Sequence, residues 1–268
     1  MITRAVIPAA GLGARLCPIT PFLPKELLPI EGLPIIHHAL FELVESGINE
    51  VMVVLSKEKA ALASYLTRAV HYKGESAERL CRARDEILSK IKIVFAEQKR
   101  LCGTADAVYL AKDFMQDEPI LVLYPDDLLS VQGRLSDGIE ATRKMMTVAE
   151  KTGCCVLLSE EIDGKKASDY GVLSVRESDK DLLIVDGIVE KPGHFVEKRA
   201  HVLIGRMVLT PKAIHAISLF DRTDAAGIIP LLDREGRQGR LLAIDHHGKR
   251  FDVGSHEGYQ RVLRELSY

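Results

Sequence analysis

The chain has 268 residues, of which 47% are hydrophobic and 28% are charged, with a formal net charge of −2. This composition supports a sizeable core, and without a basic excess we expect no nucleic-acid partner. No run of about 18 apolar residues occurs, so no membrane span is expected. The five cysteines form no C-x-x-C pair and the N-terminus is unlike a signal peptide, which favours a reduced, cytoplasmic location without a structural zinc site.

Strands and helices alternate over the first 160 residues. An apolar strand at 4–9 leads into a loop rich in glycine and proline at 10–29, and a helix opens at Pro34. The run at 51–55 is apolar throughout, as in a strand that is covered on both faces. Further strands are expected at 91–96, 120–123 and 154–158, helices at 104–115 and 138–151, and a largely helical insertion at 60–90.

Shorter strands follow residue 160. We expect strands at 171–175, 182–189, 202–209, 241–244 and 250–253, and a last helix at 257–266. No linker separates the halves 1–160 and 161–268. We therefore predict a single α/β domain with a mixed, mainly parallel sheet flanked by helices, whose second half is a smaller α+β region.

The loop after the first strand carries the strongest chemical signal. It reads Pro8-Ala9-Ala10-Gly11-Leu12-Gly13-Ala14-Arg15-Leu16-Cys17-Pro18-Ile19-Thr20, then Pro24-Lys25-Glu26-Leu27-Leu28-Pro29. Glycines after a buried strand let backbone N–H groups approach a phosphate, and Arg15 and Lys25 add charged donors. The Walker A pattern is absent, and Leu16 occupies the third glycine position of the dinucleotide fingerprint. A Gly-x-Gly alone also fits a simple turn.

Carboxylates follow two of the expected strands. Asp126 and Asp127 come at the carboxyl end of 120–123, where open α/β sheets bind ligands, and Asp252 lies in a short strand before a glycine. Such carboxylates suit Mg²⁺, although Asp126-Asp127 also fits a plain turn. Without further context, Glu190-Lys191 is a solvated surface pair and Gln98 a surface glutamine.

Together these motifs resemble the signature of the sugar-nucleotide pyrophosphorylases, and within them the bacterial UTP–glucose-1-phosphate uridylyltransferases. The resemblance covers nearly the whole chain, because further motifs recur in the family's order. They are Gln98 with Gly103-Thr104-Ala105-Asp106-Ala107-Val108, Pro125-Asp126-Asp127, Tyr170-Gly171-Val172, Val189-Glu190-Lys191-Pro192, Ile204-Gly205-Arg206, and Phe251-Asp252-Val253-Gly254 before Gly258-Tyr259.

The resemblance implies a Rossmann-like nucleotidyltransferase fold of the GT-A kind, with a nucleotide-binding half at 1–160 and a sugar-phosphate-binding half at 161–268. It implies UTP and glucose 1-phosphate as substrates, Mg²⁺ as cofactor, and a homo-oligomer, either a dimer or a tetramer. The implied site residues fall into four groups. They are Arg15 and Lys25 for catalysis, Ala10, Gly11, Leu12, Gly13, Gln98 and Gly103 for the nucleotide, Gly171, Glu190 and Lys191 for the sugar phosphate, and Asp126 and Asp252 for the metal.

Three departures from the family pattern leave alternatives open. Ala14 and Pro21 replace a usual threonine and lysine, and the usual Gly-Glu-Ile-Gln-Leu-Thr-Asp-Ala stretch reads Ala226-Gly227-Ile228-Ile229-Pro230-Leu231-Leu232-Asp233. The last change is expected to alter a contact with the nucleotide sugar or with a second subunit. A same-fold enzyme for another pair, such as dTTP with glucose 1-phosphate, or a nucleotide-sugar sensor without turnover, are the alternatives.

Overall fold

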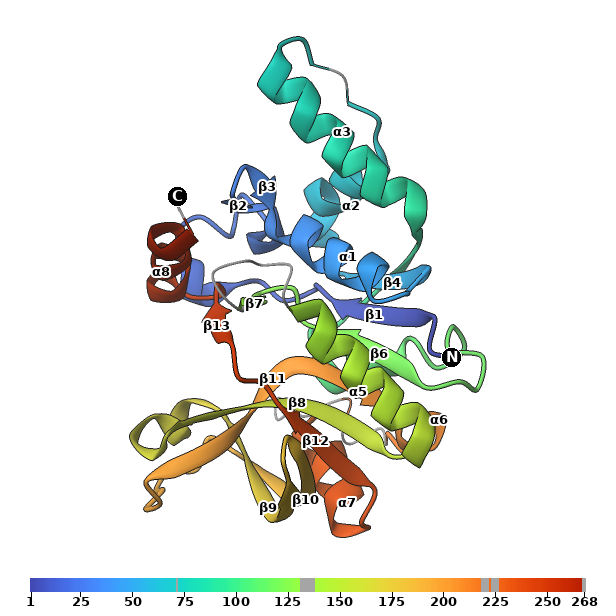
Figure 1. Cartoon of the computed structure of the whole chain (residues 1–268). Coiled ribbons are helices and arrows are strands. Elements are labelled where there is room, and N and C mark those ends of the chain that lie inside the picture. Colours follow the sequence, from blue (N-terminus) through green and yellow to red (C-terminus); the bar gives the residue numbers. More distant parts are fainter. Residues whose placement is uncertain (71, 131–137, 218–221, 223–226, 267–268) are drawn as a thin grey trace. The chain divides into compact units, whose positions relative to one another are not determined.

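The computed structural model describes residues 1–70, 72–130, 138–217, 222 and 227–266 (Figure 1). The chain forms two compact units that alternate along the sequence. The terminal unit consists of residues 3–101, 123–139 and 248–268, and the middle unit of residues 1–2, 102–122 and 140–247. The expected single domain with a boundary at residue 160 stays a prediction.

The terminal unit is built on three parallel strands in the order β5-β4-β1. Their bounds are Arg4–Pro8 for β1, Glu50–Leu55 for β4 and Lys92–Glu97 for β5. The apolar run of β4 is buried from Val51 to Leu55, as its sequence predicts for a strand covered on both faces. Around these strands lie η1 (Ala14–Leu16), η2 (Lys25–Leu27), β2 (Pro29–Ile30), β3 (Leu33–Pro34), α1 (Ile35–Glu45), η3 (Lys57–Lys59), α2 (Ala60–Thr67) and α3 (Glu75–Lys90).

The end of the chain folds back onto the loop near its beginning. β7 (Asp127–Ser130) pairs antiparallel with β13 (Lys249–Asp252), and α8 (His256–Leu266) follows directly. One apolar cluster joins these segments and comprises Leu16, Leu28, Ile30, Ile35, Leu128, Phe251, Val253, Val262 and Leu266. Tyr259 of α8 donates a hydrogen bond to the carbonyl of Pro29 at 2.8 Å. This packing holds the glycine loop against the ribbon of β7 and β13.

The described residues of the middle unit form strands in the order β6-β11-β8-β12-β10-β9. They are β6 (Ile120–Leu123), β8 (Cys155–Asp163), β9 (Gly171–Asp179), β10 (Leu182–Glu190), β11 (Arg199–Leu209) and β12 (Leu241–Asp245). β8 and β12 pair parallel, whereas β10 pairs antiparallel with both β12 and β9. Val172 of β9 also pairs with Val202 of β11, so the last strand in this order contacts the second.

The mixed α/β fold is confirmed, and the helices show where sequence reading falls short. The helix expected at 104–115 is the shorter α4 (Thr104–Tyr109), and the insertion at 60–90 contains two helices. α5 (Gly138–Thr152) was expected, whereas α6 (Pro211–His215) and α7 (Ile229–Arg237) were not. Both missed helices have proline in their first turn, where its missing N–H is harmless and its fixed φ suits a helix.

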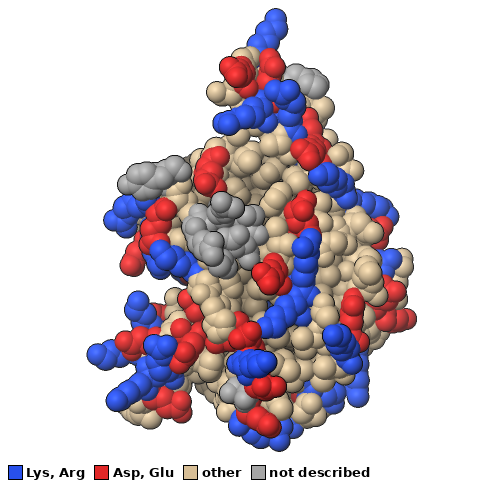
Figure 2. Space-filling model, in the orientation of Figure 1, with Lys and Arg blue, Asp and Glu red and all other residues tan. Residues whose placement is uncertain are grey.

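The surface and the helices agree with the composition. Figure 2 shows acidic and basic side chains intermixed over the visible face. None of the described helices is both long and apolar enough to cross a membrane. All five cysteines are free.

Candidate functional site

The glycine loop begins where β1 ends. The Ala9 amide continues the ladder by donating to the Val54 carbonyl at 2.9 Å. Gly13 has φ +69°, and an added Cβ there would lie 3.0 Å from Thr20 Cγ2, so the fold itself requires this glycine. At Gly11 an added Cβ would meet no described atom within 4 Å. The packing of the chain does not explain a glycine at position 11, whereas close approach of a ligand would.

Gln98 lies at the same sheet edge as this loop. It follows β5 directly and is 5% exposed. Its backbone N–H donates a hydrogen bond to the Leu55 carbonyl at 2.8 Å. It is therefore not the surface glutamine that its sequence alone suggests. Because β1 and β5 flank β4, Gln98 and the loop are two strand spacings apart, about 10 Å. That separation suits a ligand the size of a nucleoside.

Gly103 belongs to the middle unit, so it is described apart from Gln98. It precedes α4 with φ 88° and ψ −177°, a backbone conformation that side chains disfavour. The glycine at this position thus has a local structural reason in addition to any role in binding.

Two carboxylates and two cations meet beside the loop. Lys25 Nζ lies 2.5 Å from Asp126 Oδ2. Arg15 donates through Nη1 to Asp252 Oδ2 at 2.8 Å and through Nη2 to Oδ1 at 3.4 Å. An added Cβ at Gly254 would lie 2.6 Å from Asp126 Oδ2, 3.1 Å from Asp252 Oδ1 and 3.0 Å from Arg15 Nη2. The sequence-predicted residues 15, 25, 126 and 252 therefore converge on one point.

The register of the ribbon brings the carboxylates together. Asp127 of β7 stands opposite Asp252 of β13, and the Val253 amide donates to the Asp126 carbonyl at 2.8 Å. Asp127 Oδ1 accepts a hydrogen bond from Arg250 Nε at 2.8 Å, with both side chains nearly buried. Asp127 is thus committed to a structural ion pair, which leaves Asp126 and Asp252 as the carboxylates that face the loop.

The pairing keeps Lys25 and Asp126 charged. Burial would lower the pKa of Lys25, but the charges of Asp126 and Glu26 outweigh it and raise that pKa above its usual value. Burial would raise the pKa of Asp126, but the charge of Lys25 and its hydrogen bond outweigh it, so that pKa lies below the usual value. Both groups are therefore ionised throughout the neutral range.

A divalent metal fits the donors at this point. Among the described residues no cluster of three or more His, Cys, Asp or Glu could hold a metal. However, Mg²⁺ usually binds only one or two protein carboxylates, and substrate phosphates and water supply its other ligands. Both oxygens nearest Gly254 carry negative charge, which matches a hard cation. Asp126 and Asp252 are thus suited to a metal that arrives with a phosphate ligand.

A buried ion pair lies directly behind Lys25. Glu26 is fully buried, and its Oε2 lies 2.7 Å from Nζ of Lys59, which is 2% exposed. Lys59 comes from η3, just after β4, so the pair fastens the turn of Lys25 to the central strands. Sequence reading missed this contact, because an isolated Lys59 in a charged stretch gives no sign of burial.

The residues predicted for the sugar phosphate lie in the middle unit. Gly171 of β9 pairs with Glu190 of β10. An added Cβ at Gly171 would lie 3.3 Å from Glu190 Oε2 and 3.1 Å from Ile229 Cδ1, so the glycine leaves room beside that carboxylate. Lys191 has φ 45°, and its amide donates to the Tyr170 carbonyl at 3.0 Å. A left-handed lysine is strained, and such strain concentrates at functional sites.

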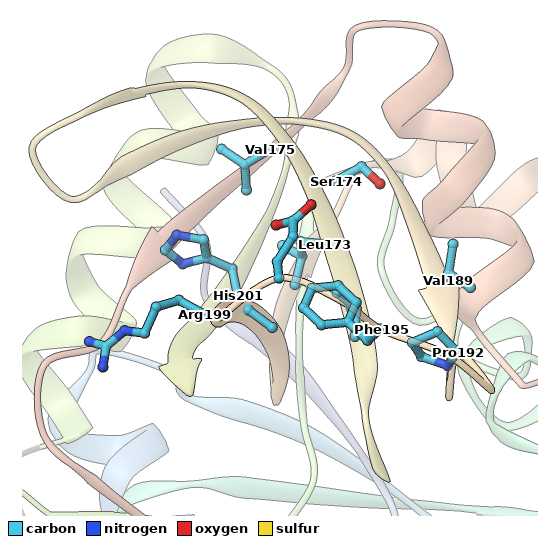
Figure 3. Close-up of a pocket in the computed structure, with 11 residues that line it drawn as sticks. Leu173, Ser174, Val175, Val189, Pro192, Phe195, Arg199 and His201 are labelled. Atoms are coloured by element: carbon cyan, nitrogen blue, oxygen red, sulfur yellow. The ribbon is translucent and has the colours of Figure 1, made fainter. Parts of the chain in front are cut away.

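A cavity of about 510 Å³ lies beside the β9–β10 hairpin (Figure 3). Its lining is Val172, Leu173, Ser174, Val175, Val189, Pro192, Phe195, Glu197, Arg199, Ala200 and His201. Val189 and Pro192 line the cavity, whereas Glu190 and Lys191, which lie between them in the sequence, are not among its lining residues. The predicted sugar-phosphate pair therefore does not line this cavity.

Known proteins match the chain over almost its full length. The family model for nucleotidyl transferases matches residues 4–267. The chain belongs to the nucleotidyl transferase family. It is 31% identical to the UTP–glucose-1-phosphate uridylyltransferase of Bacillus subtilis, over 99% of this chain and 91% of that protein.

A second relative and a solved structure agree with this assignment. The chain is 28% identical to a UTP–glucose-1-phosphate uridylyltransferase of Pseudomonas aeruginosa, over 97% of this chain and 94% of the relative. A solved UDP-glucose pyrophosphorylase in complex with UDP-glucose is similar with a TM-score of 0.86 and 27% identity, over 100% of this chain and 99% of that one.

Removing Lys59 should cost far more stability than removing the whole pair. Lys59→Met leaves the Glu26 carboxylate buried without its partner, which is expected to lower the unfolding free energy by about 3–5 kcal/mol. Lys59→Met with Glu26→Leu removes the stranded charge and should recover most of that loss. Urea unfolding at pH 8 measures both variants. A single variant within about 1 kcal/mol of the unmodified chain would contradict the role of this pair.

Proposed function

We propose that the chain transfers a uridylyl group from UTP to glucose 1-phosphate, giving UDP-glucose and pyrophosphate. The carrying observation is the convergence of Asp126 and Asp252 with Lys25 and Arg15 beside a glycine loop. This set can neutralise a triphosphate and hold a divalent ion beside it. The names of the full-length relatives support the choice of UTP and glucose 1-phosphate.

The glycine loop would bind the nucleotide. Backbone groups of Ala10, Gly11, Leu12 and Gly13 follow β1, and the open space at Gly11 supports phosphate approach there. Gln98 offers a donor and an acceptor, which match the edge of a uracil ring, at the same sheet edge. Gly103, in the middle unit, is also proposed as a nucleotide-binding residue, as the resemblance implies.

Arg15 and Lys25 would exchange their carboxylate partners for phosphate oxygens when the triphosphate binds. Arg15 is well exposed, so its guanidinium can leave Asp252 for phosphate oxygens at little cost. Lys25 would neutralise charge at the α-phosphate. Asp126 and Asp252, released from their cations, would then hold Mg²⁺. When bound, that ion supplies Lewis-acid neutralisation of the phosphate oxygens.

The second substrate would bind through Glu190, Lys191 and Gly171. Glu190 can accept hydrogen bonds from sugar hydroxyls, and Gly171 leaves the space beside it open. The Lys191 ammonium lies 3.8 Å from Glu190 Oε1 and is largely exposed, so it can turn to a phosphate. A sugar that carries a phosphate requires both kinds of contact.

The chemistry needs positioning more than proton transfer. A phosphate oxygen of glucose 1-phosphate forms a bond to the α-phosphorus of UTP, and the bond from that phosphorus to the bridging oxygen of pyrophosphate breaks. The attacking oxygen is already anionic, so no general base is needed. Lys25 and Arg15 contribute electrostatic stabilisation of the charge that spreads over the phosphates. A cytoplasmic location and a homodimer or homotetramer stay part of the proposal.

Substrate choice tests the proposal directly. We expect kcat/KM with glucose 1-phosphate to be highest for UTP, detectable for dTTP, and far lower for ATP and GTP. The ring methyl group of dTTP is expected to change affinity by only about 1–3 kcal/mol relative to UTP. The larger purine rings of ATP and GTP do not fit a site shaped for a pyrimidine. Pyrophosphate release measures all four. Efficient use of ATP or GTP would remove the uridylyl assignment, and no turnover with any pair would favour a sensor.

Lys191 provides a test that separates stability from binding. Lys191→Gly relieves the left-handed conformation and should raise the unfolding free energy by about 0.5–1 kcal/mol, since glycine adopts positive φ freely. The same variant should raise KM for glucose 1-phosphate by about tenfold, because a charge-assisted phosphate contact is lost.

Lys180 is the matched control for this variant. It is also a lysine at positive φ, with a value of 53° in the turn between β9 and β10. Lys180→Gly should give the same gain in stability with an unchanged KM. Equal KM values for the two variants would show that Lys191 does not bind the sugar phosphate.

A further inference from the structure

α7 packs against β10 more closely than most residue types would allow. An added Cβ at Gly236 of α7 would lie 2.8 Å from the Asp186 carbonyl carbon and from the Gly187 amide nitrogen. From the other side, an added Cβ at Gly187 would lie 2.6 Å from Asp233 Oδ1. Figure 1 shows α7 beside β10 and β12. Glycines on both elements thus let the helix reach the backbone of the strand.

The contact falls where β10 is irregular. The pairing of β10 with β9 shifts register on both sides of Val185, so a bulge precedes Gly187. Among the described strands, β12 pairs with β10 only at 182–184. Within the described part of the chain, no strand therefore pairs with the edge of β10 that faces away from β9 after the bulge.

Asp233 supplies the missing acceptor at this edge. Its Oδ1 accepts a hydrogen bond from the Ile188 amide at 3.1 Å. Its Oδ2 accepts one from Arg237 Nε at 2.8 Å, one turn further along α7. The carboxylate thus binds the amide of Ile188, the residue after Gly187, and also pairs with the exposed Arg237 side chain.

The same face of the helix reaches the predicted sugar site. Ile229 and Asp233 are four residues apart, so they lie on one face of α7. Ile229 Cδ1 and Glu190 Oε2 both lie near the point where a Gly171 Cβ would be. Ile188, which Asp233 holds, is two residues before Glu190 and points to the same face of β10.

We propose that Asp233 is a positioning residue for the sugar-phosphate pair Glu190 and Lys191. Because Asp233 accepts a hydrogen bond from the Ile188 amide, it holds the end of β10 against α7. The position of the Glu190 carboxylate beside Gly171 therefore depends on Asp233. This inference rests on the proposed function of Glu190 and Lys191. It also gives a role to the altered 226–233 segment, of which residue 226 lies outside the described residues. In this proposal the part of the segment that belongs to α7, from Ile229 onward, acts on the sugar-phosphate pair through β10.

Kinetics of three variants test the proposal. Asp233→Ala removes the acceptor and should raise KM for glucose 1-phosphate by about tenfold with KM for UTP within about twofold, because a small displacement of a binding group is costly. Asp233→Asn keeps an oxygen for the Ile188 amide and should remain near the unmodified chain. Arg237→Ala removes only an exposed ion pair and should also remain near it.

The outcomes separate positioning from simple stability. A purely structural role would lower the folded fraction, and with it kcat, while leaving both KM values unchanged. The proposal is overturned by that pattern, by an equal rise in both KM values, or by Asp233→Asn behaving like Asp233→Ala. If Asp233→Ala does not fold, Asp233→Ser, whose hydroxyl is too short to reach the amide, replaces it.

Hydrogen exchange keeps the inference distinct from the proposed function. The amides of residues 188–191 should exchange faster in Asp233→Ala than in Asp233→Asn, whatever the substrates are. Unchanged exchange in the alanine variant would overturn the inference. Faster exchange together with an unmodified chain that turns over no sugar 1-phosphate would refute the proposed function and with it the positioning role.

Discussion

The site depends on the mutual neutralisation of three carboxylates by three cations. Asp126, Asp127 and Asp252 come from two adjacent strands and would repel one another if left alone. Lys25, Arg15 and Arg250 each take one of them. The pair of Asp127 with Arg250 is nearly buried and fixed, whereas Arg15 is exposed. The cluster is therefore stable as it stands and can still exchange partners with a charged ligand.

This arrangement requires segments that are far apart in the sequence. Arg15 and Asp252 are 237 positions apart, and the apolar cluster that joins α8 to the glycine loop brings them together. Behind Lys25, the buried pair of Glu26 with Lys59 ties the same loop to the central strands. Stability of the fold and geometry of the charges are thus produced by the same contacts.

The sequence predicts the parts of this site that rest on local patterns. An apolar strand followed by glycines predicts β1 and its loop, and carboxylates after an apolar strand predict Asp126. The pairing of β7 with β13 could not be predicted, because each has only four residues and no distinct period. The burial of Gln98 and of Lys59 depends on packing across the sheet, which a single sequence does not encode locally.

Binding of UTP with and without Mg²⁺ is the most direct test of the charge-exchange account. In calorimetric titration, Mg²⁺ should strengthen UTP binding to the unmodified chain by at least about tenfold, because it offsets the repulsion between carboxylates and phosphates. Without Mg²⁺, Asp252→Asn should bind UTP at least as tightly as the unmodified chain does. Addition of Mg²⁺ should strengthen UTP binding to this variant only a little. UTP affinity that is indifferent to Mg²⁺ in the unmodified chain would contradict the account.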